Sequence, residues 1–370
     1  MPMMEEDWEL LTTFFPTDWE ALGKQENALK GLRKNKSAED FLRTLLIHVG
    51  CGHSLRETVV RAEMAGLGQM SDVALLKRLR KSKEWLHMLC RRLLEERLGP
   101  ASGPNAGDTA MYLLDGTLVS EPGRTGSQWR IHYSMRWPDL TCDFFKLTPV
   151  EGKGNGESLA RFPVTPGNHY IADRGYCTAA GIRHIASGGG FVAVRIIPGC
   201  IRFHTPEGQV LPLLDELRKL DRPNEVTQWH VAAGGATGDL ATPGRLCVLR
   251  KTETLIHEAH LKLRRKASKN GVEIRPETLE YAKFIMVFTT FDEGRFPAAT
   301  VLEWYRIRWQ VELVFKRFKQ IASLGHLPKH DAESSQAWLY GKLFVALLTE
   351  KMLAHAQSFS PWGYDLAPNP

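Results

Sequence analysis

Residues 305–319 read Tyr-Arg-Ile-Arg-Trp-Gln-Val-Glu-Leu-Val-Phe-Lys-Arg-Phe-Lys, and this stretch decides the fold that we expect. Tyr305, Arg308, Glu312 and Lys319 follow one another at steps of three, four and seven residues. At 3.6 residues per turn, the four side chains fall within an arc of about 60° on one helix face. The stretch therefore predicts a helix with one carboxylate among cations, an arrangement that suits a divalent metal beside a polyanion.

Two further acids follow predicted strands. Asp115 ends a strand that begins at residue 110, and Asp173 ends a strand that begins at residue 169. Each acid also has a simpler interpretation, because Asp115 suits a turn and Asp173 suits a helix cap. Glu312 could likewise form a surface pair with Lys316, one helical turn later. Taken together, and in this order, the three acids instead indicate a shared metal site.

The order of the predicted elements favours an α/β fold with a ribonuclease-H-like core. Three consecutive antiparallel strands are followed by strands that alternate with helices, and in such a core the first and fourth strands are neighbours. A later helix must then bring the third acid beside the sheet. The predicted strands are 110–114, 129–137, 140–147, 169–173 and 191–196, with a helix at 178–186.

The first hundred residues predict a helical DNA-binding domain. Ser54-Leu-Arg-Glu57 is a capping-box pattern that begins one helix, and residues 66–68 break it with two glycines. Ser71-Asp72 caps a second helix, which is basic, so the pair resembles a helix-turn-helix. Any hairpin of two helices would show the same pattern. The residues that we expect to contact DNA are Lys77, Arg78, Arg80 and Lys81.

Changes in periodicity and composition divide the chain into five regions. The regions are a helical DNA-binding domain (1–105), the first part of the core (106–196), a β-rich insertion (197–283), the last core strand with the Glu-bearing helix (284–330), and a C-terminal helix and tail (331–370). Pro297 suits the first position of the Glu-bearing helix, and Gly325 suits its end.

Bulk composition narrows the class of protein. The chain has 370 residues, a formal net charge of +6, and basic clusters at 30–36, 77–83, 262–269 and 306–319. Separated basic clusters favour a partner with an extended phosphate backbone, although any one of them could be a solvated helix face. The six cysteines lack C-x-x-C spacing, which argues against a zinc site and suits reduced thiols in a cytosolic protein. No apolar run is long enough for a membrane span.

Phosphodiester chemistry explains why three acids would be brought together. Hydrolysis and strand transfer need an activated water or 3′-hydroxyl, and two divalent metals about 3.5–4 Å apart provide this while neutralising the attacking and leaving oxygens. Carboxylate oxygens suit Mg²⁺ or Mn²⁺. We therefore expect Asp115, Asp173 and Glu312 to be both the catalytic residues and the ligands of two such ions.

The four-residue spacing resembles the Y-(2)-R-(3)-E-(6)-K signature of DDE transposases of the insertion-sequence-four family. Asp115-Gly116-Thr117 and Asp173-Arg174-Gly175-Tyr176 resemble the two aspartate segments of that family. The resemblance implies that Tyr305, Arg308 and Lys319 contact the transposon end. Several members stack a flipped base on an aromatic residue, and the sequence does not identify that residue here. Trp229 lies in the insertion, but it stands in a run of alternating residues that suits strand packing equally well.

We therefore expect a cytoplasmic DNA transposase, associated with the nucleoid when bound, that cleaves insertion-sequence ends and joins them to target DNA. Its partner would be double-stranded DNA, on which it would assemble as a homodimer, with no membrane partner. The C-terminal part is short for this family, which favours one alternative, a non-catalytic transposase-derived DNA-binding protein or repressor. Another alternative is a structure-specific nuclease that cleaves without joining.

Overall fold

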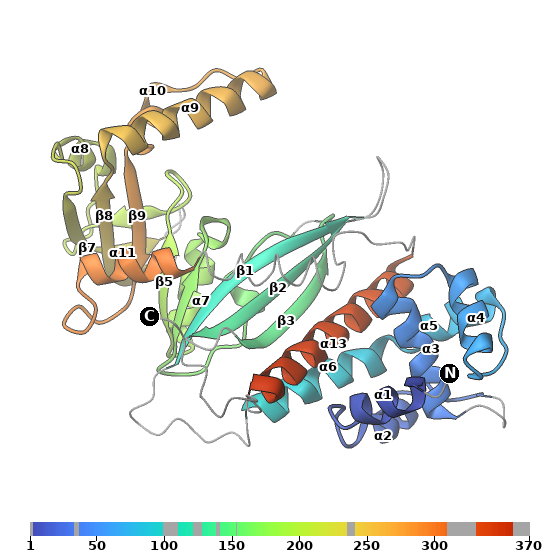
Figure 1. Cartoon of the computed structure of the whole chain (residues 1–370). Helices are drawn as coiled ribbons and strands as arrows, with labels where there is room; N and C mark the ends of the chain where they lie inside the picture. The colour runs from blue at the N-terminus through green and yellow to red at the C-terminus, as the bar shows by residue number, and fades with distance from the viewer. Residues whose placement is uncertain are drawn as a thin grey trace.

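The computed structural model describes residues 3–32, 37–98, 110–120, 128–137, 141–152, 154–234, 241–308 and 331–357. In these residues the chain forms a helical part followed by a mixed α/β part (Figure 1). The N-terminal helices are α1 (Met3–Thr12), α2 (Trp19–Gln25), α3 (Ala38–Cys51), α4 (Leu55–Met64), α5 (Asp72–Lys81) and α6 (Lys83–Leu98).

The expected pair of helices is confirmed, with its caps. The Ser54 hydroxyl accepts a 3.1 Å hydrogen bond from the Glu57 amide at the start of α4. The Ser71 hydroxyl accepts one of 3.2 Å from the Ala74 amide at the start of α5. Both bonds satisfy amide groups that a helix start leaves unpaired, which explains why each helix begins where it does.

The described strands form one mixed sheet in the order β3-β2-β1-β4-β5-β9-β8-β7-β6. The first three strands are antiparallel, β1, β4 and β5 are parallel, and the remaining pairs are antiparallel. The strands are β1 (Met111–Ser120), β2 (Gln128–Trp137), β3 (Thr141–Pro149), β4 (His169–Ala172), β5 (Phe191–Arg195), β6 (Arg202–His204), β7 (Val226–Gly234), β8 (Thr242–Arg250) and β9 (Phe284–Thr289).

One strand boundary differs from expectation, and one connection between strands could not be foreseen. β1 continues to Ser120, so Asp115 lies inside the strand and not at its end, because the pairing with β2 continues as far as Ser120 opposite Gln128. The strands of the segment 197–283 join the same sheet as the core strands, since β9 pairs with β5 on one side and with β8 on the other. One sheet therefore connects the two expected regions.

Seven further helices lie between strand β3 and residue 308 in the described chain, and two of them, α7 and α11, pack on the sheet. The seven are η1 (Leu159–Arg161), η2 (Arg174–Tyr176), α7 (Ala179–Ser187), α8 (Leu213–Arg218), α9 (Glu253–Asn270), α10 (Pro276–Tyr281) and α11 (Ala298–Ile307). α11 contacts β5, β7, β8 and β9, and α7 contacts β5, β7 and β8. Neighbouring residues in these strands alternate between two apolar clusters: Cys247 belongs to the cluster with α11, and Val248 to the cluster with α7. The two helices thus cover opposite faces of the sheet.

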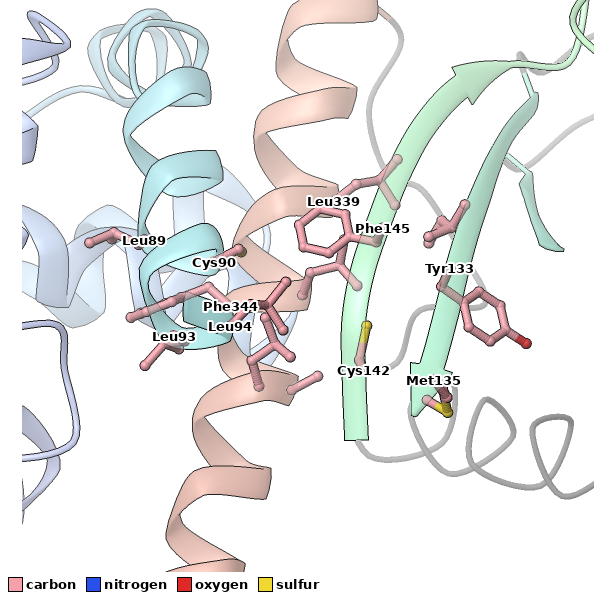
Figure 2. Close-up of a cluster of buried hydrophobic side chains, with 14 of the residues drawn as sticks. Leu89, Cys90, Leu93, Leu94, Tyr133, Met135, Cys142, Phe145, Leu339 and Phe344 are labelled. Carbon is pink, nitrogen blue, oxygen red and sulfur yellow. The ribbon is translucent and has the colours of Figure 1, made fainter. Parts of the chain in front are cut away.

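The last described helix, α13 (Ala332–Gln357), returns to the N-terminal helices. It lies along α6 and also contacts α3 and α5 (Figure 1). Figure 2 shows Leu93 and Leu94 of α6 beside Phe344 of α13, with Phe145 on the strand next to these helices and Tyr133 on the strand beyond it. These residues belong to one apolar cluster. Helices from the two ends of the described chain are therefore joined to the sheet through one continuous core.

Candidate active site

Asp115 and Asp173 stand on neighbouring parallel strands. The last residues that pair between β1 and β4 are Leu114 and Ala172, so each aspartate comes directly after that pair. Side chains alternate along a strand, and Leu113 and Ile171 both belong to the cluster that contains α11 residues. The two aspartates, two positions later, are directed towards the same face of the sheet. The expectation that the first and fourth strands are neighbours is confirmed.

Helix α11 brings a phenol and a guanidinium to the same place. The Tyr305 hydroxyl donates a 2.9 Å hydrogen bond to Asp173 Oδ1. Arg308 Nη1 donates to Asp115 Oδ2 at 3.4 Å, and Arg308 Nη2 lies 3.8 Å from Asp173 Oδ1. Both side chains are 91% buried, with relative exposures of 9%. One cation thus stands between two carboxylates in a largely water-excluded site.

Electrostatics account for this arrangement. Two carboxylates that face one another repel, and a guanidinium within ion-pair distance of both offsets that repulsion. Burial, followed by the charge of Asp173, raises the pKa of Tyr305 to about 12, so the phenol remains a hydrogen-bond donor. Burial and the nearby Asp115 also raise the pKa of Tyr133 well above its ordinary value. The site therefore holds negative charge close to uncharged phenols and one fixed cation.

Glu312 and Lys319 lie outside the described residues. Helix α11 is described to Ile307, and Arg308 keeps helical backbone angles. Within the described ranges, no three His, Cys, Asp or Glu side chains gather as a metal-binding set. The expected third acid therefore stays a prediction from the sequence.

The sequence places His132 with Arg130 on a strand face that we would expect to be partly exposed, but the structure buries this histidine on the face opposite the two aspartates. His132 lies opposite Gly116 in the β1–β2 ladder and is fully buried. Its Nδ1 is hydrogen-bonded to Tyr176 Oη at 3.1 Å, and its Nε2 to Thr148 Oγ1 at 3.0 Å. The alternation of strand β2 places His132 on one face, but nothing in the sequence indicates that Tyr176 would meet it there.

The four residues expected to contact DNA from α5 fall into two kinds. Lys77 and Lys81 are exposed. Arg78 donates to the backbone oxygens of residues 28, 30 and 31, which fixes the turn after α2. Arg80 makes two hydrogen bonds to Asp331, at 3.2 and 2.8 Å, just before α13. The two arginines thus support the fold in this structure, while the two lysines face solvent.

Helix α9 carries one of the basic clusters found in the sequence. Lys262, Arg265, Lys266 and Lys269 recur at the spacing of one helix face, and all four are exposed. In Figure 1, α9 extends beyond the end of the sheet together with α10. Trp229, by contrast, is packed against the apolar cluster beside α7, which agrees with strand packing.

No described helix combines the length and the apolar character that crossing a membrane requires.

Comparisons with known proteins place this geometry in context. Residues 154–348 match the family described as "Transposase DDE domain". The chain is 31% identical over 351 residues to the putative transposase InsL for insertion sequence element IS186A of Escherichia coli (strain K12), which covers 94% of this chain and 93% of that protein. It is 31% identical over 352 residues to the transposase for insertion sequence element IS421 of Escherichia coli, with the same coverage. It is 22% identical over 375 residues to the transposase for insertion sequence element IS231B of Bacillus thuringiensis subsp. berliner, covering 92% and 78%.

Proposed function

The chain belongs to the DDE transposase family, and from that premise we propose that Asp115, Asp173 and Glu312 are its three catalytic acids. A DNA transposase of this family is a metal-dependent enzyme that cleaves nucleic acid. The observation that carries the assignment is the position of Arg308, whose guanidinium lies within 3.8 Å of a carboxylate oxygen of both aspartates. Two acids from separate strands already share one positive charge.

The core that supports the acids is proposed to be ribonuclease-H-like. The order β3-β2-β1-β4-β5 supports this, since its first three strands are antiparallel and its last three are parallel. Strand β9, expected as the last core strand, would complete the core beside β5, and β8, β7 and β6 would then be the β-rich extension beyond it. The acid-bearing segments sit at the β1–β4 junction, at the centre of the proposed core.

The donor set fits two Mg²⁺ or Mn²⁺ ions. Carboxylate oxygens are the ligands that these hard cations prefer, and a guanidinium shared by Asp115 and Asp173 stands in for a cation at the same place. When bound, the two metals would activate water or the 3′-hydroxyl and neutralise charge on the phosphodiester. The protein's own contribution is to hold the carboxylates on rigid strands and to keep the site largely closed to water.

Tyr305, Arg308 and Lys319 are proposed to bind phosphates of the transposon end. An arginine fork suits phosphate oxygens, and a lysine supplies a point charge. In the structure Tyr305 and Arg308 instead contact the aspartates. We therefore propose an exchange of partners: when metal neutralises the carboxylates, the phenol and the guanidinium are released to the DNA. Such an exchange would couple metal binding to binding of the transposon-end DNA.

DNA contact is proposed to extend well beyond the acids. In the N-terminal domain, the basic residues of α5 would contact double-stranded DNA, with Lys77 and Lys81 already facing solvent. The exposed cationic face of α9 supports a second contact with the phosphate backbone. We also propose that the protein assembles as a homodimer on transposon ends and then joins these ends to target DNA.

The test is a cleavage and strand-transfer assay on matched insertion-sequence ends in Mg²⁺ or Mn²⁺. Asp115→Asn, Asp173→Asn and Glu312→Gln should each abolish cleavage and leave end binding intact, because each change removes a metal ligand without removing a phosphate contact. Glu303→Gln, an exposed acid on α11, is the matched control and should cleave normally.

Each outcome of the assay distinguishes one function from another. Undiminished cleavage by the Glu312→Gln variant would remove Glu312 from the site. Binding without any cleavage by the unmodified chain would favour the non-catalytic DNA-binding alternative. Cleavage without joining would favour the structure-specific nuclease.

A further inference from the structure

The backbone by itself leaves the spacing of the two aspartates unfixed. The β1–β4 ladder ends at Leu114 and Ala172, one residue before each acid. Beyond that pair, β1 continues beside β2, while the chain after Asp173 turns away through η2. Arg308 and Tyr305 reach the acids from α11, and on the opposite face of the sheet a second contact holds the Asp173 segment against β1.

Tyr176 makes that contact. It is the last residue of η2, three positions after Asp173, and it is fully buried. Its hydroxyl lies directly against Gly116, since a Cβ added to this glycine would come within 2.8 Å of Tyr176 Oη. Real Cβ atoms do not approach an oxygen so closely, so only glycine fits here without movement. The residue after Asp115 thus has to be small because a side chain from the Asp173 segment rests on it.

His132 holds the Tyr176 hydroxyl in place. The imidazole lies opposite Gly116 on β2, and it is itself hydrogen-bonded on its other nitrogen to Thr148 of β3. Burial, followed by the charges of Arg161, Arg130 and Lys146, lowers the pKa of His132 to about 3. The imidazole is therefore neutral at physiological pH. Two strands and one turn are joined through two uncharged hydrogen bonds.

Gly116 transmits this contact to the acid. Its amide donates a 2.8 Å hydrogen bond to Asp115 Oδ1. A displacement of Gly116 would therefore rotate the Asp115 carboxylate that faces Arg308 and Asp173. The chain of contacts runs from Thr148 through His132 and Tyr176 to Gly116, and ends on a carboxylate oxygen of Asp115.

We propose that Tyr176 and His132 are positioning residues that set the separation and orientation of the Asp115 and Asp173 carboxylates for metal binding. This inference rests on the proposed function, in which both carboxylates are metal ligands. It assigns a role to residues on the face opposite the acids. Partners of metal ligands typically change metal affinity about 10- to 100-fold when they are altered.

A reciprocal pair of substitutions tests the inference, with Mn²⁺ alone as the probe. Gly116→Ala adds a methyl group against Tyr176 Oη and should raise the Mn²⁺ dissociation constant about tenfold, measured by electron paramagnetic resonance. Tyr176→Phe removes the oxygen and with it the bond to His132, so this variant should by itself weaken Mn²⁺ binding by up to about threefold. The double variant has room for the methyl group and should therefore recover to that threefold level from the tenfold loss of Gly116→Ala. Gly156→Ala is the matched control, because its added Cβ meets nothing within 4 Å.

Thermal unfolding of all four variants separates positioning from folding. A purely structural role would lower the melting temperature without a recovery of Mn²⁺ affinity in the double variant. Equal dissociation constants for Gly116→Ala and Gly156→Ala, or a double variant no better than Gly116→Ala, would overturn the inference. If the unmodified chain binds Mn²⁺ no better than a chain carrying Asp115→Asn and Asp173→Asn, it is the proposed function that fails.

Discussion

Tyr305 donates its hydroxyl hydrogen to Asp173 across 2.9 Å, which ties helix α11 to the end of strand β4. The bond joins residues that are 132 positions apart in the chain. Arg308, one turn later, reaches Asp115 as well as Asp173. Tyr305 and Arg308, which we expect to bind DNA, thus contact the two aspartates when DNA is absent. The first two predictions test these contacts.

Tyr305→Phe should lower the free energy of unfolding by about 1–2 kcal/mol, because it removes a buried hydrogen bond to a carboxylate while keeping the ring. Urea denaturation at neutral pH measures the change. Tyr340→Phe is the control, since it removes a hydroxyl from another half-buried ring, one that stacks on His87 and makes no contact with the aspartates. Equal losses in the two variants would mean that the bond to Asp173 contributes nothing.

Arg308→Ala should bind Mn²⁺ more tightly than the unmodified chain when DNA is absent, by severalfold. The guanidinium competes for the carboxylates that would hold the metal, so its removal leaves the acids open to the ion. The same variant should bind transposon-end DNA more weakly, because it lacks a phosphate contact. Titration with Mn²⁺ alone and with end DNA alone gives the two constants.

A neighbouring arginine provides the control for the expected gain in Mn²⁺ affinity. Arg306 is exposed on the same helix, and Arg306→Ala should leave the Mn²⁺ constant unchanged. Weaker Mn²⁺ binding by Arg308→Ala would show that Arg308 supports the metal site and does not compete with the metal.

Double replacement of Lys77 and Lys81 by alanine should weaken DNA binding and leave stability unchanged, because both side chains face solvent. The slope of log affinity against log salt should become shallower by about 1.8, if each lysine neutralises one phosphate. Arg78→Ala should mainly reduce stability, since it removes hydrogen bonds to the turn after α2. An unchanged salt slope in the lysine variant would exclude this face of α5 from the DNA contact.

Stability should decline slightly in acid through Asp331. Burial alone would raise the pKa of Asp331, but hydrogen bonds from Arg80 and Ser334 outweigh it and lower this pKa to about 2. The folded pKa lies below the unfolded value of about 3.9, so the contribution is complete above about pH 5 and is lost as the pH falls towards 2.

The size of this acid effect is limited by solvent screening. The Arg80 and Asp331 side chains are 37% and 38% exposed, so we expect only about 0.5 kcal/mol. Urea unfolding at pH 5 and pH 3 measures it, with Asp331→Asn as the reference. A variant that loses as much stability between the two pH values as the unmodified chain would contradict the prediction.

Local sequence patterns predicted the elements well because they reflect local physics. The alternation in residues 129–137 became β2, and the serines at 54 and 71 became helix caps. Asp115-Gly116 looked like a turn because Asp and Gly favour turns. In the structure, glycine is required there by the contact with Tyr176, and the strand simply continues.

Long-range contacts account for what the sequence did not reveal. Periodicity does not specify the order of strands, so it could not show that β9 would lie between β5 and β8. Nor could it show that Arg308 would meet Asp115, 193 positions away. The acids were predicted from their residue type and setting, whereas their present partners depend on how α11 crosses the sheet.

The crossing of α11 also has a consequence for the timing of synthesis. Translation at about 5–20 residues per second needs roughly 7–26 s to pass from Asp173 to Tyr305, which are 132 residues apart. Through that interval the two aspartates would lack the phenol and the guanidinium that hold them. The contacts that Tyr305 and Arg308 make with the two aspartates thus form late on the ribosome, and a chain released before α11 would carry two mutually repelling carboxylates with neither stabilising partner.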